Sequence, residues 1–155
     1  MILQGKYTKT QASAIEYFAT QLLTPQLKKH IIINLKFIRK LPVCGFTEVD
    51  GHNTKGVPRE FILEILHGMS EKQTLKTIAH EMVHVKQHAK NEHVKKHVTA
   101  RGGLKIESYW MGKLWRPSNG EVDFYDAPWE VEAYGREVGL MHRWINYKEK
   151  SLKKQ

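Results

Sequence analysis

The chain has 155 residues, with 25 lysines and arginines against 16 aspartates and glutamates, which gives a formal net charge of +9. This length fits one domain with its own core, and 41% hydrophobic residues argue against a disordered chain. The single cysteine excludes an intrachain disulfide and a zinc site built from cysteine pairs.

The N-terminal residues lack the basic segment and long apolar segment of a secretory signal, and no apolar run is long enough to span a bilayer. We therefore expect a cytoplasmic, monomeric protein with no membrane partner. The positive net charge suggests weak nucleic-acid binding through a basic surface, although net charge bears on association and not on fold.

The first half of the chain predicts one helix followed by two strands. Apolar residues recur at the helical period over residues 10–29, where Pro25 bends or ends the helix. Alternating apolar residues predict strands over 31–38 and 59–66. Turn-forming residues between them predict a loop over 49–56.

The second half predicts two more helices around a β-segment. A strongly amphipathic helix is expected over residues 71–89, with Ser70 as its N-cap. A glycine pair interrupts the pattern, and a hairpin or irregular β-segment is expected over 104–125. A proline then begins a last helix over 128–147, and the lysine-rich tail 148–155 is expected to fray.

These elements predict an α+β fold in one domain over residues 1–147. It would contain an N-terminal helix, a small mixed sheet of three or four strands, the amphipathic helix and a closing helix. No linker or internal repeat divides the chain.

The amphipathic helix carries an H-E-x-x-H motif, His80-Glu81-Met82-Val83-His84. Residues four apart lie on one helical face, so both imidazoles can bind one metal ion. Zinc binds neutral imidazole nitrogen, and the glutamate beside the first ligand can take a proton from a metal-bound water. The motif therefore predicts a zinc centre with Glu81 as general base.

A catalytic zinc usually has three protein ligands, so a third must come from elsewhere in the chain. Glu130 and Glu132 lie in the first turns of the predicted last helix, and His97 follows the motif at a workable distance. His88 continues the same helical stripe but cannot complete a tetrahedron well. We expect His88, His93 and His97 to be solvated histidines on a basic helix end.

A resemblance to zincin metallopeptidases rests on this motif and on residues 128–137, Pro-Trp-Glu-Val-Glu-Ala-Tyr-Gly-Arg-Glu. The chain more closely resembles small gluzincin-like proteins of phage and bacterial type, over about residues 60–140. In that group a second helix supplies a glutamate ligand, often in a Glu-x-x-Ala setting, which residues 130–133 match.

The resemblance implies a zinc-dependent metallopeptidase of zincin-like fold, acting on a peptide or protein, with ligands His80, His84 and Glu130. Glu132 is the alternative, because a shift of two residues turns the side chain by about 200° around the helix. The sequence departs from the larger gluzincins at Tyr134, where an aspartate or asparagine often supports a histidine ligand.

The resemblance also implies that the strand beside the metal helix lies at the sheet edge and pairs with an extended substrate, a role that we assign to residues 61–66. Peptide hydrolysis also needs a hydrogen-bond donor for the developing oxyanion. The sequence does not choose among five candidates, which are Tyr109, Tyr125, Tyr134, Arg136 and His142.

Two other functions stay open. SprT-like DNA-associated proteases use a third histidine ligand, for which His97 is the candidate, and residues 72–105 hold eight lysines and arginines against two acids. Such a basic stretch can bind a phosphate backbone. The other alternative is a non-catalytic module that binds metal or nucleic acid.

Overall fold

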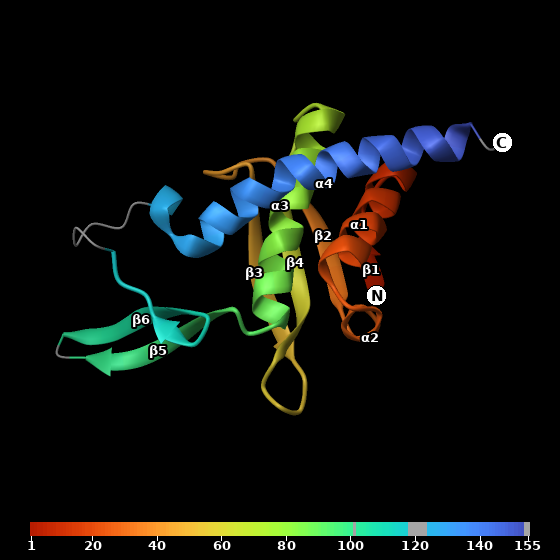
Figure 1. The fold of residues 1–155 in the computed structure, drawn as a ribbon. Helices are drawn as coiled ribbons and strands as arrows, with labels where there is room; N and C mark the ends of the chain where they lie inside the picture. The colour runs from red at the N-terminus through yellow and green to blue at the C-terminus, as the bar shows by residue number, and fades with distance from the viewer. Residues whose placement is uncertain (101, 118–123, 154–155) are drawn as a thin grey trace.

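The computed structural model describes residues 1–100, 102–117 and 124–153, which form an α+β domain (Figure 1). Helices cover one face of a four-stranded sheet, and a smaller three-stranded sheet projects from its side. The strands of the larger sheet are β1 (Ile2–Gly5), β2 (Ile32–Ile38), β3 (Gly45–His52) and β4 (Pro58–Leu66).

The larger sheet is mixed and has the strand order β1-β2-β4-β3. The first three strands in this order run parallel, and β3 runs antiparallel to β4 with Thr47 opposite Leu63. The assignment of residues 61–66 to the sheet edge is therefore wrong, because β4 pairs on both of its sides. The edge beside the helix that carries the H-E-x-x-H motif is β3. This strand begins before the loop predicted over 49–56 and includes the first residues of that loop.

Three helices enclose the core on one face of this sheet. The helices α1 (Lys9–Leu22) and α3 (Glu71–Ala89) lie against the sheet. The helix α4 (Pro128–Leu152) crosses both of these helices (Figure 1). A short helix, α2 (Pro25–Lys28), begins at the proline predicted to end or bend the first helix. The core side chains are almost fully buried and include Phe18, Ile33, Leu35, Phe61, Leu63, Ile65, Ile78, Met82 and Val83.

The helix α3, which carries the H-E-x-x-H motif, has recognisable signals at both ends. Ser70 accepts a hydrogen bond from the Gln73 amide at its N-terminus, as predicted. At its C-terminus Asn91 has a φ of 57°, a left-handed conformation that asparagine tolerates and that ends a helix. The chain then turns directly into a strand.

The smaller sheet consists of β5 (His93–Ala100), β6 (Gly103–Trp110) and β7 (Lys113–Leu114). Its antiparallel strands project from the body of the domain (Figure 1). The predicted β-segment after residue 104 corresponds to β6 and β7. The strand β5 was not predicted, because its lysines and histidines resemble the end of a basic helix.

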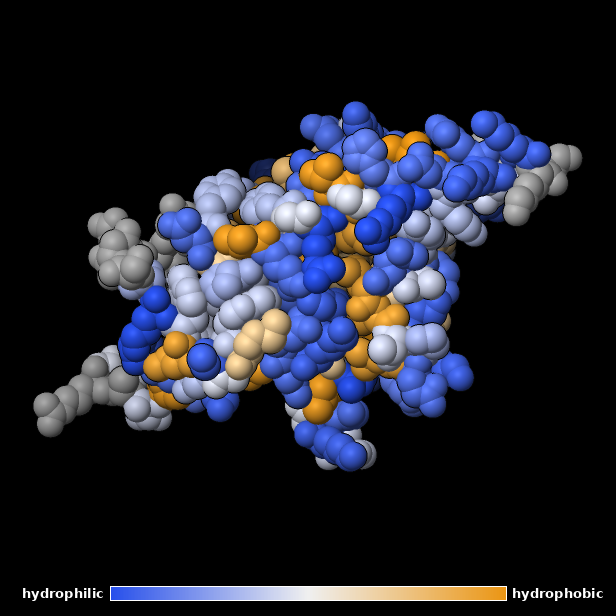
Figure 2. All heavy atoms as spheres, in the orientation of Figure 1, coloured by the Kyte–Doolittle hydropathy of each residue, from blue (hydrophilic) through white to orange (hydrophobic). Residues whose placement is uncertain are grey.

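The last helix is longer than expected. It continues to Leu152, so the predicted end at residue 147 is too early and much of the lysine-rich tail is helical. Residues 154–155 of that tail lie outside the described residues. Hydrophilic side chains cover most of the face shown in Figure 2. Among the described residues, no helix is long and apolar enough to cross a membrane.

Candidate metal centre

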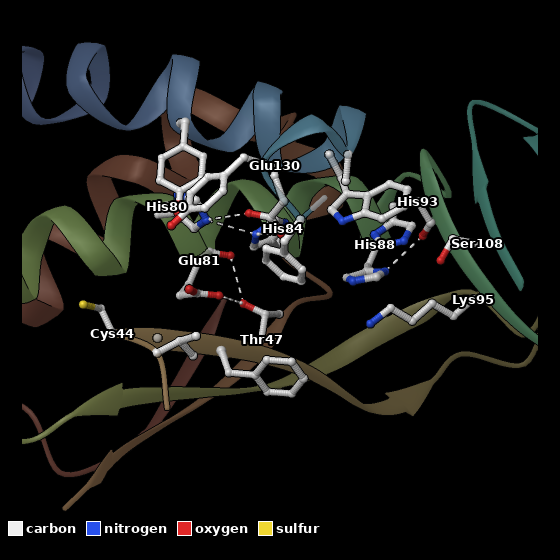
Figure 3. Close-up of a pocket in the computed structure, with 18 of the residues that line it drawn as sticks. Cys44, Thr47, His80, Glu81, His84, His88, His93, Lys95, Ser108 and Glu130 are labelled. Atoms are coloured by element: carbon white, nitrogen blue, oxygen red, sulfur yellow. Dashed lines mark hydrogen bonds and ion pairs between the residues drawn. The ribbon is translucent and has the colours of Figure 1, made fainter. Parts of the chain in front are cut away.

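The helices α3 and α4 bring together His80, His84 and Glu130 (Figure 3). The two Nε2 atoms of the histidines lie 3.2 Å apart. Glu130 Oε2 lies 3.3 Å from His80 Nε2, and Glu130 Oε1 lies 3.4 Å from His84 Nε2. Ligand atoms bound to tetrahedral zinc are about 3.3 Å apart, as follows from bonds of about 2.0–2.1 Å. The three side chains thus already have the spacing that such an ion requires.

The hydrogen bond of His80 fixes which of its ring nitrogens faces the centre. His80 Nδ1 lies 3.0 Å from Glu137 Oε2, and a carboxylate can only accept, so Nδ1 carries the proton. The lone pair of Nε2 then points toward His84 and Glu130. Carboxylates commonly orient metal-binding histidines in this way.

His84 is oriented by Gln87 in the same manner. The Gln87 side-chain nitrogen donates to the Trp129 carbonyl at 2.9 Å and to Glu132 Oε2 at 3.0 Å. Its oxygen therefore faces His84 Nδ1, 2.8 Å away, and accepts the proton of that nitrogen. Two imidazole nitrogens and one carboxylate thus converge, an arrangement that a cation between them would stabilise.

The charges at the centre agree with this arrangement. Burial alone would raise the pKa of Glu130, but its contacts with His80 and His84 outweigh burial and hold the pKa at about 2. Burial would lower the pKa of His84, yet its contact with Glu130 and the nearby Glu81 raise it. The surroundings of these ligands therefore favour a positive charge, which a proton or a metal ion can supply.

Two residues of the edge strand β3 contact the Glu81 side chain, which projects from α3. The Thr47 hydroxyl donates to Glu81 Oε2 at 2.7 Å, and the carboxyl group is buried. A Cβ on Gly45 would lie 2.7 Å from Glu81 Oε1 and 2.5 Å from Thr77 Cγ2, so only glycine leaves room there. Burial raises the pKa of Glu81 more than Thr47 and the two histidines lower it, which suits a group that exchanges a proton.

The other proposed third ligands lie elsewhere. Glu132 is turned away and accepts from Lys86 Nζ at 2.6 Å and from Arg136 Nε at 2.8 Å. His97 is exposed on β5, where it pairs with Ile106 of β6. In the described part of the chain, the acids and histidines that gather closely enough to hold a metal are His80, His84 and Glu130.

Sequence reasoning missed the two residues that orient the histidines. Glu137 lies about two helical turns beyond Glu130, so it shares a face of α4 with the third ligand. Gln87 lies three residues after His84, a spacing that places it beside that histidine. Tyr134, the position where the larger gluzincins often have an acid or amide, instead packs its ring edge-on against His80 with centroids 4.6 Å apart.

Replacing Glu137 with glutamine should weaken zinc binding by about 10- to 100-fold, because an amide holds the His80 ring less strongly than a carboxylate. Competition with a chromogenic chelator measures this affinity. Lys76→Gln is the matched control, since Lys76 contacts the other oxygen of Glu137 at 3.0 Å without touching His80. An equal loss in both variants would assign the effect to the ion pair and contradict the orienting role.

A cavity of about 1330 Å³ opens onto His80, His84, Glu130 and Glu81. Its walls come from β3, α3, the β5–β6 hairpin and the start of α4. Of the five candidate oxyanion donors, Tyr125 and Tyr134 line this cavity, whereas Tyr109, Arg136 and His142 do not.

Two histidines that were expected to be solvated are buried at the hairpin end of this cavity. The exposed fraction is 8% for His88 and 3% for His93. The His93 ring stacks between His88 and Trp129, at centroid distances of 4.9 and 4.0 Å. The expectation is wrong for these two residues because the chain turns into β5 and lays His93 against Trp129. His97, farther along the strand, is exposed as expected.

The buried pair predicts acid-sensitive stability. Burial lowers the pKa of His88 to about 4 and that of His93 to about 3, so both are neutral in the folded protein at neutral pH. The unfolded chain takes up protons near pH 6.5, so their contribution is complete above that pH and is lost as the pH falls toward 4 and 3. As the pH falls through that window, protonation of each histidine in the unfolded chain should lower the free energy of unfolding by up to about 1.4 kcal/mol per pH unit.

Urea unfolding of metal-free protein between pH 7 and 5 measures this dependence. His93→Gln should flatten the pH dependence, and His97→Gln on the exposed part of the same strand should leave it unchanged. Equal slopes for wild type and His93→Gln would contradict the prediction.

No family model, curated protein or solved structure matches this chain. Its function therefore has to be inferred from the geometry and chemistry of the site.

Proposed function

We propose that this protein is a zinc-dependent metallopeptidase of zincin-like architecture. His80, His84 and Glu130 would hold the ion, and Glu81 would act as the general base. The observation that carries the proposal is the set of mutual distances of 3.2–3.4 Å among the three donor groups. A buried carboxylate, positioned by Thr47, lies beside them.

The donor set favours a hydrolytic centre over a structural one. Structural zinc sites are closed and rich in cysteine, whereas two histidines and one glutamate leave a fourth position for water or substrate. All three ligands and Glu81 line the open cavity, so a substrate can approach them.

Each side chain around the centre has a defined part in peptide hydrolysis. A bound zinc ion would polarise the scissile carbonyl and lower the pKa of a water molecule to about 7. Glu81 would accept a proton from that water and later deliver it to the leaving amine. The Thr47 hydroxyl keeps the Glu81 carboxylate in place during both transfers.

Tyr134 is a candidate donor to the oxyanion. It lines the cavity beside His80. Burial, followed by the neighbouring Tyr125 and Glu130, raises its pKa, so its hydroxyl stays protonated at neutral pH. Tyr125 lies next to it, with ring centroids 5.7 Å apart. A preorganised donor at this point would stabilise the charge that develops on the carbonyl oxygen.

The strand β3 would take the substrate-pairing role. It forms an edge of the larger sheet, carries Thr47 and Gly45 against Glu81, and presents Phe46 to the cavity. An extended peptide can add to such an edge through backbone hydrogen bonds, with the cleaved bond beside the metal ligands.

Zinc-dependent cleavage of a mixed peptide library, followed by mass spectrometry, tests the proposal. We expect new peptide termini with the zinc-loaded protein, their loss on chelation, and their return when zinc is restored. Zinc-loaded protein that cleaves neither peptides nor unfolded proteins would contradict it.

A further inference from the structure

His93 is a buried polar side chain without a hydrogen bond. Among the described residues, neither of its ring nitrogens has a partner, although the residue is only 3% exposed. An unpaired buried polar group is costly and rare, so its presence points to a ligand that completes it. His93 lines the cavity at the end away from Glu81 (Figure 3).

A positive charge lies next to this histidine. Lys95 follows on the same strand and lines the same cavity, and Figure 3 shows its ammonium group extending toward the region below His88. Its charge adds to burial in lowering the pKa of both His88 and His93. Ser108 lies opposite Lys95 on β6 and also lines the cavity.

These residues are suited to an anion and not to a second metal ion. The His88 and His93 rings are stacked with an angle of 24° between their planes, so their in-plane lone pairs do not converge on one point. A lysine ammonium would also repel a cation. A carboxylate, by contrast, can accept hydrogen bonds from an imidazole N–H, an ammonium and a hydroxyl together.

We propose that His93, Lys95 and Ser108 form a subsite that binds a carboxylate of the peptide substrate. This inference rests on the proposed function, because it names the kind of substrate that the metal centre would cleave. His88 lies one turn beyond His84 on α3, about 6 Å along the helix axis. The His93 ring stacks on His88 at 4.9 Å, and an extended peptide advances about 3.3 Å per residue, so the carboxylate would lie a few residues from the cleaved bond.

The carboxylate can come from an aspartate or glutamate side chain or from a free C-terminus. Three alanine-based pentapeptides distinguish these sources: one with a central glutamate and blocked ends, its glutamine counterpart, and the glutamine peptide with a free C-terminal carboxylate. Each is titrated into the Glu81→Gln variant with zinc, which prevents turnover. Tryptophan fluorescence reports binding, because Trp129 stacks on His93.

We expect at least one carboxylate peptide to bind about tenfold more tightly than the blocked glutamine peptide, as befits a charge-assisted contact at a partly open site. The peptide that gains affinity identifies the source of the carboxylate. Lys95→Gln should remove the difference, and because Lys95 is exposed, this loss would not come from unfolding. Lys96→Gln should keep it, since Lys96 lies over the Tyr109 ring on the opposite face of the hairpin.

Equal affinities for the three peptides, no measurable binding of any of them, or equal losses in the two lysine variants would overturn the subsite. Binding in this experiment does not require cleavage. A carboxylate preference without any peptidase activity would therefore reject the proposed function and keep the subsite, whereas cleavage without a carboxylate preference would do the reverse.

Discussion

Glu81→Gln should reduce peptide cleavage by about 10²- to 10⁴-fold, the usual contribution of a general base. Glutamine has nearly the same shape as glutamate and can still accept the Thr47 hydrogen bond, but it cannot take a proton from water. Zinc content should stay at wild-type stoichiometry, because Glu81 is not among the three grouped ligands. Rates and metal content are measured on the same samples.

The pair of measurements separates a catalytic centre from a metal-binding module. A variant that keeps its zinc and loses cleavage supports the general-base role. A variant that cleaves at the wild-type rate would contradict that role even if zinc is present. Thr47→Val offers a graded comparison, since it removes the hydroxyl that positions Glu81 and should lower the rate less than Glu81→Gln does.

Glu130→Ala should weaken zinc binding by more than about 100-fold, which exceeds the loss typical of residues that only support a ligand. It removes the carboxylate that lies within 3.4 Å of both histidines and leaves two nitrogen ligands on one helix. Zinc affinity is measured by competition with a chelator, and circular dichroism verifies that the fold is retained.

Glu132→Ala is the matched control, because Glu132 lies two residues away in the same helix and contacts Lys86, Arg136 and Gln87 instead of the two histidines. We expect this variant to lose less zinc affinity than Glu130→Ala, because Gln87 keeps its hydrogen bond to the Trp129 carbonyl. It should also lose some stability, since Lys86 is buried and, among the described residues, keeps Glu92 as its ionic partner. A larger zinc loss in Glu132→Ala than in Glu130→Ala would reverse the ligand assignment.

Periodic apolar patterns predicted the central elements of the fold well. The strand ending at Leu66 and the helix from Glu71 to Ala89 have nearly the predicted bounds, and Ser70 caps that helix. The strand is buried on one face, and the helix is buried on all sides from Ile78 to Ala89, so the core restricts the residues of both elements directly. The two histidines of the motif face the same point because the helical repeat dictates it.

The strands β3 and β5, which line the cavity, were not predicted from the sequence, and the reason is physical. The edge strand β3 includes Asp50 and Gly51, where its pairing with β4 is irregular, so it has the composition of a loop. The strand β5 carries Lys95 and Lys96, and only pairing with β6 makes it a strand. Edge strands bury little of their surface, so the alternation that reveals an inner strand is weak in them.

Tertiary contacts also decided which charges and histidines are buried. His93 is covered because Trp129, far along the chain, stacks on its ring. Lys86 belongs to the basic stretch 72–105, yet it is only 6% exposed and lies between Glu92 and Glu132. Sequence spacing within one element does not report such contacts, because the partners come from other elements.

A crystal structure of the zinc-loaded protein, with anomalous diffraction recorded on both sides of the zinc absorption edge, tests the metal centre most directly. We predict one zinc peak within about 2.0–2.2 Å of His80 Nε2, His84 Nε2 and a Glu130 carboxylate oxygen, with a further position open to the cavity. A zinc ion bound by other residues, or no peak between α3 and α4, would contradict the proposed centre.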